Sequence, residues 1–209
     1  MLLAVPDLAA GAAWLRERYG LVALPGGRHP GVGTANMLVP LGGEYLELIT
    51  VVDPVEAAAN PLGLVAPALE RGARLATWAV RTPDVEASKS RLASLGISTI
   101  GPREGARQRP DGMTLRWRTL HLEDGLDPAL PFLIEWDVPA GQHPAEQQVE
   151  HPAGEVRIAR VVLASPGPEE LARRLKKLLG EVAFEVVPGE RDEVRAVRLR
   201  SGDGEVEVA

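Results

Sequence analysis

The sequence contains no cysteine among its 209 residues. This absence excludes disulfide bonds, thiolate metal sites and cysteine nucleophiles. No apolar run approaches the ~18 residues that a helix needs to cross a bilayer. The N-terminal segment lacks the basic region of a signal peptide and soon becomes charged and helical in pattern. The sequence therefore favours a cytoplasmic protein with no membrane partner.

The chain also lacks an excess of positive charge. It has 23 Lys and Arg residues against 29 Asp and Glu residues, which gives a formal net charge of −6. Proteins that bind nucleic acids or membrane surfaces need a basic face to meet phosphate groups, so no nucleic-acid partner is expected. No Walker loop, G-x-S-x-G elbow or dinucleotide-binding fingerprint occurs in the sequence. These absences leave a small-molecule ligand as the expected partner.

One pattern occurs three times along the chain. Each copy begins with an apolar strand, turns at a corner rich in Pro, Asp or Gly, continues as an amphipathic helix and ends at a Gly. The three copies open at residues 2–22, 77–97 and 159–182, and strand-like segments follow each of them. A repeated β-α-β-β-β unit predicts an α+β fold in which the units pair to enclose a cleft.

These units divide the chain into three regions. Residues 1–138 carry the first two units, and residues 155–209 form a third, degenerate one. Residues 139–154 are rich in Pro, Gly, Gln and Glu and are predicted to form a linker. Two histidines in or beside this linker, His143 and His151, are therefore expected to be solvated.

Local signals place several element ends. Asp7 is predicted to cap the first helix, which Gly20 ends, and Asp84 is predicted to cap the helix of the second unit. The second unit opens with a predicted strand over residues 73–81. Residues 104–112 are polar and contain two glycines, so we expect a loop there.

The motifs of the first two units resemble a known superfamily. LAVPDL leads into the first helix and YLELI ends the first unit, while GGRHPGVGTANMLVPLG, RPDGMTLRWR and PFLIEW complete the match within residues 1–137. The chain resembles the vicinal-oxygen-chelate superfamily of glyoxalase I enzymes, extradiol dioxygenases and drug-resistance proteins, and more narrowly the glyoxalase-like domain group. The resemblance implies mixed curved sheets that form a cup with helices on the outside. The third unit is then expected beside the cup or at a homodimer contact.

In metal-using members, the resemblance implies four ligands that face the cup, commonly two His on first strands and two Glu on last strands. Such a set holds an octahedral divalent ion and leaves positions for substrate oxygens. The Glu positions fall on Glu47 and Glu135, one His position falls on Thr77 or Trp78, and the other would precede Met1. Two carboxylates alone bind a divalent ion weakly. The cofactor is thus unknown: a metal on Glu47 and Glu135 is one hypothesis, and a site without metal is the favoured one.

Glu47 and Glu135 are the first candidates for a site. Each lies in a predicted strand between apolar neighbours, and a carboxylate in such company is costly unless it is paired, metal-bound or protonated. Both are therefore candidate metal ligands or acid–base groups. The alternative is a structural ion pair with Arg116 or Arg118.

A segment of the first unit supplies two more candidates. Residues 28–36 are expected to form a hairpin loop and the start of a strand, in which Gly31 and Gly33 let the backbone approach a ligand. His29 and Asn36 offer hydrogen-bond donors and acceptors there, and His29 could supply the imidazole that the first strand lacks. The alternative is a hairpin loop whose polar groups only satisfy the turn.

Two arginines complete the candidate site. Arg116 and Arg118 share one face of a predicted strand, with Trp117 between them on the other face. Two guanidinium groups in a cleft could clamp an anionic substrate. The alternative is cross-strand ion pairing with Glu47 or Glu135.

Two functional hypotheses follow. The first is a glyoxalase-like enzyme of lyase, isomerase or oxygenase type, in which Glu47 and Glu135 act on an oxygen-rich small molecule. The other four candidates, His29, Asn36, Arg116 and Arg118, would then orient the substrate. The second hypothesis is a metal-free protein of the same fold that binds or sequesters a ligand such as a drug.

Overall fold

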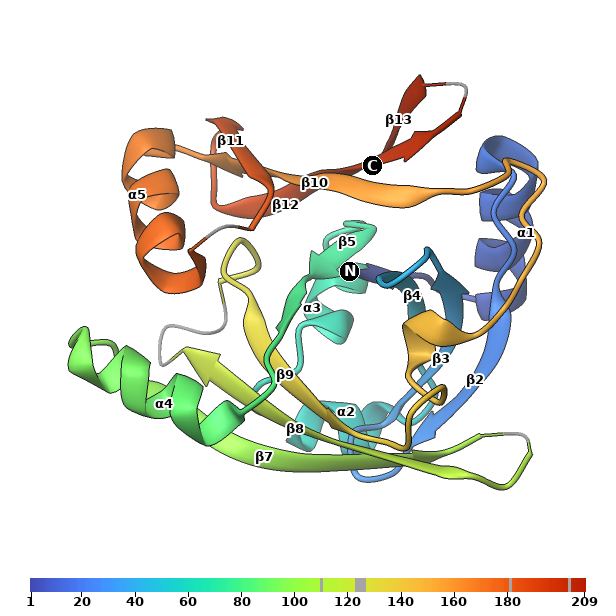
Figure 1. The fold of residues 1–209 in the computed structure, drawn as a ribbon, viewed down its shortest axis with the longest axis horizontal. Helices are drawn as coiled ribbons and strands as arrows, with labels where there is room; N and C mark the ends of the chain where they lie inside the picture. The colour runs from blue at the N-terminus through green and yellow to red at the C-terminus, as the bar shows by residue number, and fades with distance from the viewer. Residues whose placement is uncertain (110, 123–126, 181, 203) are drawn as a thin grey trace.

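The computed structural model describes residues 1–109, 111–122, 127–180, 182–202 and 204–209. Within them, 13 strands form three sheets, and helices pack outside the sheets or close the space between them. In Figure 1 the third sheet crosses the top of the molecule, the second sheet crosses the bottom, and the first sheet stands at one side. The predicted α+β class is confirmed.

The first sheet contains the strands of the first unit and one strand of the second. Its order is β2-β3-β4-β1-β5. The elements are β1 (Leu2–Ala4), α1 (Leu8–Tyr19), β2 (Leu24–His29), β3 (Thr34–Pro40), β4 (Tyr45–Val51) and β5 (Leu75–Thr77). The Asp7 carboxylate accepts a hydrogen bond of 2.7 Å from the Ala10 amide, and Gly20 adopts a left-handed conformation at the helix end. Both predicted caps are confirmed.

The second sheet repeats this plan. It contains β6 (Ala79–Arg81), β9 (Phe132–Asp137), β8 (Thr114–Leu122) and β7 (Thr99–Gln108), in that order, with α4 (Val85–Ser94) on its outer face. In each sheet the first strand of the unit pairs in parallel with the last one: β1 with β4, and β6 with β9. The predicted cap is confirmed here too, since the Asp84 carboxylate accepts from the amides of Glu86 and Ala87.

Two predictions for the second unit are wrong. The single strand expected over residues 73–81 is divided at Trp78: β5 joins the first sheet and β6 joins the second. Trp78 is buried at this junction, and its Nε1 donates to the Ala129 carbonyl over 2.9 Å. The loop expected over residues 104–112 is largely strand, because β7 continues to Gln108 in antiparallel pairing with β8.

The third unit has the expected element order but a different strand order. It contains β10 (Arg157–Ser165), α5 (Pro168–Leu179), β11 (Phe184–Pro188), β12 (Glu193–Ser201) and β13 (Gly204–Val208). Its first strand, β10, lies between β11 and β12 instead of beside the last strand. The chain returns through α5 directly to the edge of β10, as in a β-α-β crossover. The third unit is therefore not a structural copy of the other two.

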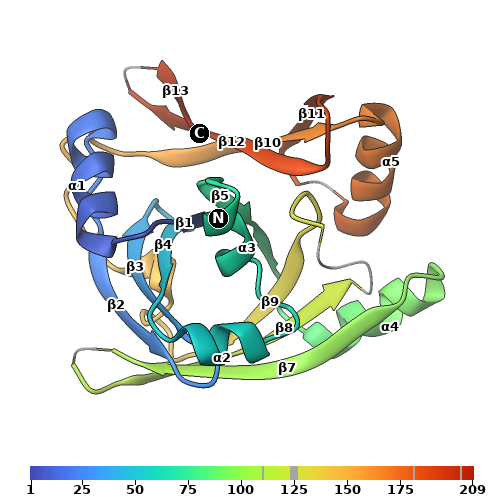
Figure 2. The same cartoon turned by 180° about the vertical axis from the view of Figure 1, so that it is seen from behind.

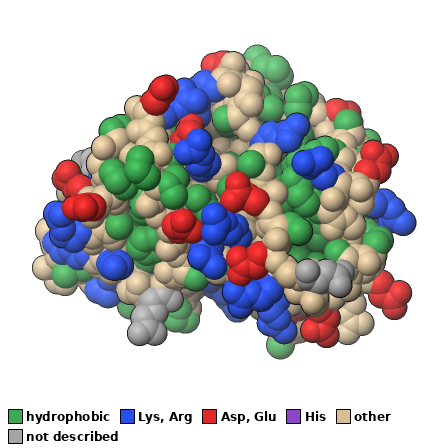
Figure 3. All heavy atoms as spheres, turned by 90° about the horizontal axis from the view of Figure 1, so that it is seen from above, with side chains coloured by type: hydrophobic (Ala, Val, Ile, Leu, Met, Phe, Trp, Pro, Cys, Tyr) green, Lys and Arg blue, Asp and Glu red, His purple; other side chains and the backbone are tan. Residues whose placement is uncertain are grey.

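The third sheet has one apolar face and one charged face. Its inner side chains join the same core as those of the first two units, and β12 packs beside β5. On the outer face arginines and glutamates form cross-strand ion pairs, and Figure 3 shows the two signs interspersed there. The residues in these pairs are Arg160, Arg198, Arg200, Glu185, Glu205 and Glu207. The third unit thus covers the space between the first two sheets.

The segment predicted as a linker is packed against the first unit. It contains a short 3-10 turn, Pro144–Glu146, which is preceded by a buried His143. The His151 ring accepts a hydrogen bond from the Val22 amide at Nδ1 and lies 2.7 Å from the Pro40 carbonyl at Nε2. The expectation that both histidines are solvated is wrong, because each ring satisfies backbone groups.

A helical connector joins the first two units. It carries α2 (Pro54–Ala59) and α3 (Val65–Glu70). Both ribbon views place α3 near the centre, between the sheets, and Figure 2 shows α2 beside the lower strands. None of the helices in the described part of the chain is long and apolar enough to cross a membrane. The connector instead closes one side of the space that the sheets enclose.

Candidate functional site

A cavity of about 690 Å³ lies between the first two sheets. Its volume falls within the range typical of small-molecule sites. Side chains from both sheets, the helical connector and the inner face of the third sheet line it. The cavity therefore draws on all three units of the chain.

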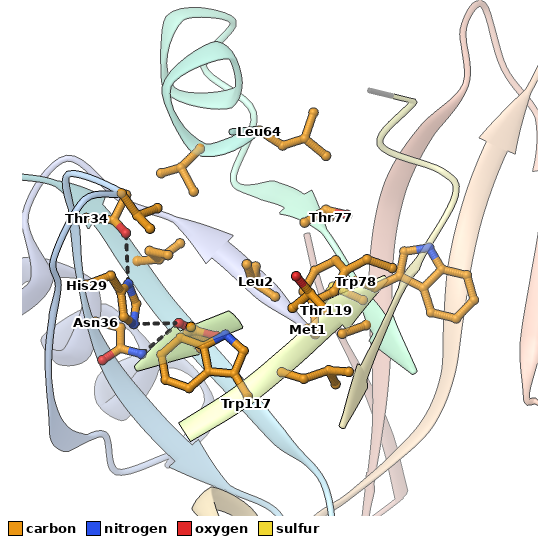
Figure 4. Close-up of a pocket in the computed structure, with 18 of the residues that line it drawn as sticks. Met1, Leu2, His29, Thr34, Asn36, Leu64, Thr77, Trp78, Trp117 and Thr119 are labelled. Carbon is orange, nitrogen blue, oxygen red and sulfur yellow. Dashed lines mark hydrogen bonds and ion pairs between the residues drawn. The ribbon is translucent and has the colours of Figure 1, made fainter. Parts of the chain in front are cut away.

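Three polar side chains meet on the wall formed by the first sheet. The Asn36 Nδ2 atom on β3 donates to the Glu47 Oε1 atom on β4 over 2.7 Å. The His29 Nε2 atom on β2 lies 4.0 Å from the same oxygen. Figure 4 shows His29 and Asn36 side by side, with the Trp117 ring next to them. We call His29, Asn36 and Glu47 the polar cluster; its members are 7%, 5% and, for the Glu47 side chain, 12% exposed.

The backbone of β2 holds the Asn36 amide in one orientation. Its Oδ1 atom accepts a hydrogen bond of 2.9 Å from the Gly27 amide, so Nδ2 faces Glu47 as a donor. A Cβ atom at Gly26 would collide with Asn36 Oδ1, which makes a glycine necessary at that position. The hairpin loop expected around residue 28 is thus partly strand, and its glycines make room for a side chain of the site.

His29 is neutral near pH 7. Burial lowers the pKa of its imidazole, Arg107 lowers it further, and the Glu47 carboxylate opposes both effects. The His29 Nδ1 atom lies 2.8 Å from the Thr34 hydroxyl, which orients the ring. Both neighbours of Glu47 in the cluster are therefore uncharged, and two basic groups act on the carboxylate from outside the cluster: the Met1 amino group and the Arg107 guanidinium. The Glu47 Oε2 atom forms no hydrogen bond with any residue that the structure describes.

An aromatic wall extends from the polar cluster. The Trp117 ring lies edge-on to His29 at 5.8 Å between centroids and 5.2 Å from the ring of Trp136. Tyr45 and His143 continue the wall, each in edge-on contact with Trp136. Burial raises the pKa of the Tyr45 hydroxyl, which stays protonated, and lowers the pKa of His143 to about 4. Such a wall suits a ligand with an apolar or flat part.

The structure places Glu135 on the opposite face of its sheet. Its neighbours on β9, Ile134 and Trp136, line the cavity, whereas Glu135 turns towards α4. The Arg118 Nη2 atom donates to both carboxylate oxygens over 2.9 Å, and the Val85 amide donates to Oε2 over 2.7 Å. The hydrogen bond from Arg118 has the largest effect on the Glu135 carboxylate and the one from the Val85 amide the next largest, and both lower its pKa. Glu135 therefore forms the structural ion pair with Arg118 that the sequence offered as an alternative. It does not face Glu47 across a metal or substrate.

Arg116 also lies outside the cavity. It is exposed on the same outer face as Arg118, as the two-residue spacing predicts, while Trp117 lies on the cavity face. The expected clamp of Arg116 and Arg118 on a substrate therefore does not fit this arrangement. Of the six candidates from the sequence, the structure brings together His29, Asn36 and Glu47 and separates the other three from them.

Comparison with known proteins agrees with this architecture. A family model described as "Glyoxalase-like domain" matches residues 1–179. The chain belongs to the glyoxalase-like domain family. The resemblance to the vicinal-oxygen-chelate superfamily is thereby confirmed. Among curated proteins, none matches the chain.

One solved structure shows the same fold over nearly the whole chain, and two others align with a smaller part of it. A hypothetical protein from Staphylococcus aureus aligns with a TM-score of 0.80 at 16% identity, over 97% of this chain and 90% of that one. A methylmalonyl-CoA epimerase from Mycobacterium tuberculosis aligns with a TM-score of 0.48 at 18% identity, over 66% and 85% of the two chains. A hypothetical protein from Bacillus halodurans C-125 gives a TM-score of 0.47 at 13% identity, over 72% and 94%. Only the likeness to the first of these three extends over nearly the whole chain, third unit included.

The cavity of this glyoxalase-like protein does not fit the four-ligand metal site of the superfamily. Thr77, at one of the two expected His positions, carries a hydroxyl and not an imidazole, and it pairs with Leu2 on β1, which in turn pairs with Glu47. Glu135 faces away, and no group of three or more His, Asp or Glu side chains that could hold a metal occurs among the described residues. Because the polar cluster offers only two donors of that kind, His29 and Glu47, we derive no chemical step through a metal.

Three arginines that the sequence analysis did not select line the cavity, Arg81, Arg103 and Arg107, and Arg107 is the buried one. Arg107 lies on β7 and is 2% exposed. The polar stretch around it was expected to form a loop, so no strand face was assigned to it. In the strand register Gly105 pairs with Trp117 and Arg107 pairs with Leu115, so Arg107 lies on the same face of the sheet as Trp117. Treating residues 104–108 as a strand paired with β8 would have placed Arg107 on that face.

Proposed function

We propose that the protein is a small-molecule enzyme of the glyoxalase-like class in which Glu47 transfers a proton. The observation that carries this proposal is the polar cluster: a carboxylate 12% exposed on a cavity wall, hydrogen-bonded to the uncharged Asn36 with the neutral His29 at 4.0 Å. A carboxylate that is oriented by a neutral amide and forms no ion pair with a Lys or Arg side chain of the described residues is suited to act as a general base. Its Oε2 atom is the one left for the substrate.

Each member of the cluster has a role in this chemistry. The Glu47 carboxylate takes a proton from an oxygen-rich substrate and returns it to the substrate or to a leaving group. Asn36 fixes the carboxylate through its 2.7 Å hydrogen bond. The neutral His29 lies 4.0 Å from the same carboxylate, where its ring can donate a hydrogen bond to a bound substrate or accept one from it. Proton transfer of this kind is common to the isomerase and lyase classes, which the polar cluster supports directly.

The first experiment identifies a ligand and then looks for turnover. We would screen a defined panel of small hydroxy acids, oxo acids and organic phosphates by thermal shift and follow the compounds that bind by proton NMR in D₂O. The proposal expects at least one bound compound to exchange a carbon-bound proton or to react with the wild type. The Glu47→Gln variant should bind the same compound and lose this activity by about 10²- to 10⁴-fold.

The alternative function is a metal-free protein that binds or sequesters its ligand. The Thr77 side chain at an expected His position and the aromatic wall favour it. It predicts that compounds from the same panel bind to the wild type and leave unchanged after prolonged incubation in D₂O. That result, with tight binding, would overturn the enzyme hypothesis. The cytoplasmic location and a homodimer, both expected from the sequence, stay predictions.

A further inference from the structure

Arg107 is a buried cation that has no partner among the residues that the structure describes. It is 2% exposed, and its guanidinium forms no hydrogen bond or ion pair with any residue that the structure describes. A guanidinium group is charged at every physiological pH and carries five N–H donors. Burying such a group without an acceptor is costly. The arrangement therefore indicates an acceptor that comes from outside the chain.

Other arginines of the same region show what a satisfied guanidinium looks like here. Arg109, two residues further along, contacts the Asp111 carboxylate and the Gln142 side chain, both at 2.8 Å. Arg118 forms its paired hydrogen bonds with Glu135. Both of these side chains are more exposed than Arg107 and still have partners. Arg107 differs in that it lines the cavity.

The surrounding charges favour an anion beside Arg107. Glu47 is the acidic group whose charge acts most strongly on it, but the Glu47 carboxylate does not contact the guanidinium and is held by Asn36 instead. Tyr45 stays protonated, and Arg109 adds a second positive charge. A Cβ atom added at Gly27 on β2 would lie 3.6 Å from Arg107 Nη1, so the strand passes close to the guanidinium. Among the described residues the guanidinium is buried and unpaired.

We propose that Arg107 is the anion anchor of the cavity and pairs with a carboxylate or phosphate group of the ligand. Both groups match the fork of a guanidinium, which binds two oxygens at once. The aromatic wall would then hold the rest of the ligand next to Glu47. This assignment rests on the proposed function and deepens it, because it names organic anions as the substrate class.

The experiment compares charged and neutral probes of the same shape. Benzoate, phenyl phosphate and benzyl alcohol share a ring that suits the aromatic wall, and their binding is followed by quenching of tryptophan fluorescence at low salt. We expect benzoate or phenyl phosphate to bind to the wild type about tenfold more tightly than benzyl alcohol. The preferred anion of the two identifies the ligand group. Equal binding of all three probes, or no binding of either anion, would overturn the proposal.

Two variants assign the preference to one residue. Arg107→Gln should lose the preference for the anion, whereas Arg116→Gln, the same change on the outer face, should keep it. Arg107→Lys keeps the charge but not the fork and should retain only part of the preference. If Arg107→Gln keeps the preference, the anchor is elsewhere. If it fails to fold, the guanidinium has a structural partner, and the proposal is equally overturned.

Glu47→Gln separates this inference from the proposed function. Loss of the Glu47 charge should leave anion binding as tight as in the wild type or tighter, because a nearby negative charge is removed. The anion preference is measured without turnover, so it stands or fails by itself. An intact preference with no turnover of any compound would retain the anchor and favour the ligand-binding alternative.

Discussion

Glu47 and Glu135 occupy similar places in the sequence and opposite places in the structure. Each lies on the last strand of its unit between apolar neighbours. Glu47 faces the cavity, where its hydrogen-bond partner is a neutral amide. Glu135 faces α4, where a guanidinium and the first amide of the helix hold it. Glu135 is paired directly with a cation, whereas Glu47 is hydrogen-bonded to a neutral amide and interacts with the Met1 amino group and Arg107 only from a longer distance.

The partners explain why the two carboxylates differ in function. An ion pair with Arg118 and the positive end of α4 stabilise the charge of Glu135, which makes it a poor base and a good structural link. This link fastens α4 to two strands of the second sheet. Glu47 receives one neutral donor and leaves one oxygen towards a cavity of ligand size. The difference lies in the neighbours, which sequence position alone does not show.

The largest expected effect separates the two residues by kinetics. Glu47→Gln should lower kcat/KM for the substrate found by the D₂O screen by about 10²- to 10⁴-fold, because the base is lost. Glu135→Gln removes a charge on the outer face and should leave kcat/KM within about threefold of the wild type at a temperature where both are folded. A comparable loss in both variants would show that the two carboxylates act together after all.

For the free energy of unfolding we expect the reverse order, with a larger effect at Glu135 than at Glu47. Glu135→Ala removes the partner of Arg118 and of the Val85 amide, so we expect the free energy of unfolding in urea to fall by about 2 kcal/mol. Glu86 is the matched control, since its carboxylate lies 3.7 Å from Arg118 and is mostly exposed. Glu86→Ala should change the same free energy by less than about 0.5 kcal/mol. An equal loss for both variants would place the stabilisation elsewhere.

A pH series distinguishes the histidines beside the cavity from Glu135. The pKa of His143 is about 4 in the folded protein, below its usual 6.5, so the unfolded chain binds a proton first as the pH falls. Stability from this burial is complete above pH 6.5 and is lost towards pH 4. The pKa of Glu135 is lowered from its usual 4.5, so its contribution is lost only below that pH. The interval from pH 7.5 to 5.0 thus reports on the histidines and on the Met1 amino group, since burial lowers the pKa of that group from 8.0 to about 6.

His143→Asn tests this assignment. Asparagine does not titrate and keeps an acceptor for the Ala145 amide, which His143 Nδ1 now binds at 3.1 Å. Between pH 7.5 and 5.0, urea unfolding of the variant should therefore depend less on pH than that of the wild type. Some dependence should stay, because burial also lowers the pKa of His29, of His121 to about 4 and of the Met1 amino group to about 6. An unchanged dependence would mean that His143 is not the group that titrates.

The sequence was sufficient wherever the evidence is local. Side-chain caps such as those of Asp7 and Asp84 act within three residues, and the motifs of the first two units were enough to identify the fold. The sequence was insufficient where the role of a residue depends on which face of a strand its side chain occupies. A shift of one residue moves a side chain to the other face, so Ile134 holds the cavity position that had been assigned to Glu135. Arg107 was missed because a polar, glycine-containing strand resembles a loop.

The smallest expected effect is that of added divalent metal ions, and it tests directly whether Glu47 and Glu135 have different roles. If Glu47 and Glu135 held one ion, the two carboxylates would be equivalent; the structure separates them, and His29 with Glu47 provides too few donors for a tight octahedral site. Elemental mass spectrometry of protein purified without a histidine tag should therefore find Mn, Fe, Co, Ni and Zn far below one per chain. Added divalent ions should not raise the thermal stability of the wild type. A stoichiometric metal that is lost in Glu47→Gln but kept in Glu135→Gln would make Glu47 a ligand, with His29 as its partner. That outcome would replace the hypothesis of proton transfer by Glu47 with that of a metalloenzyme. Glu135 would keep its structural role.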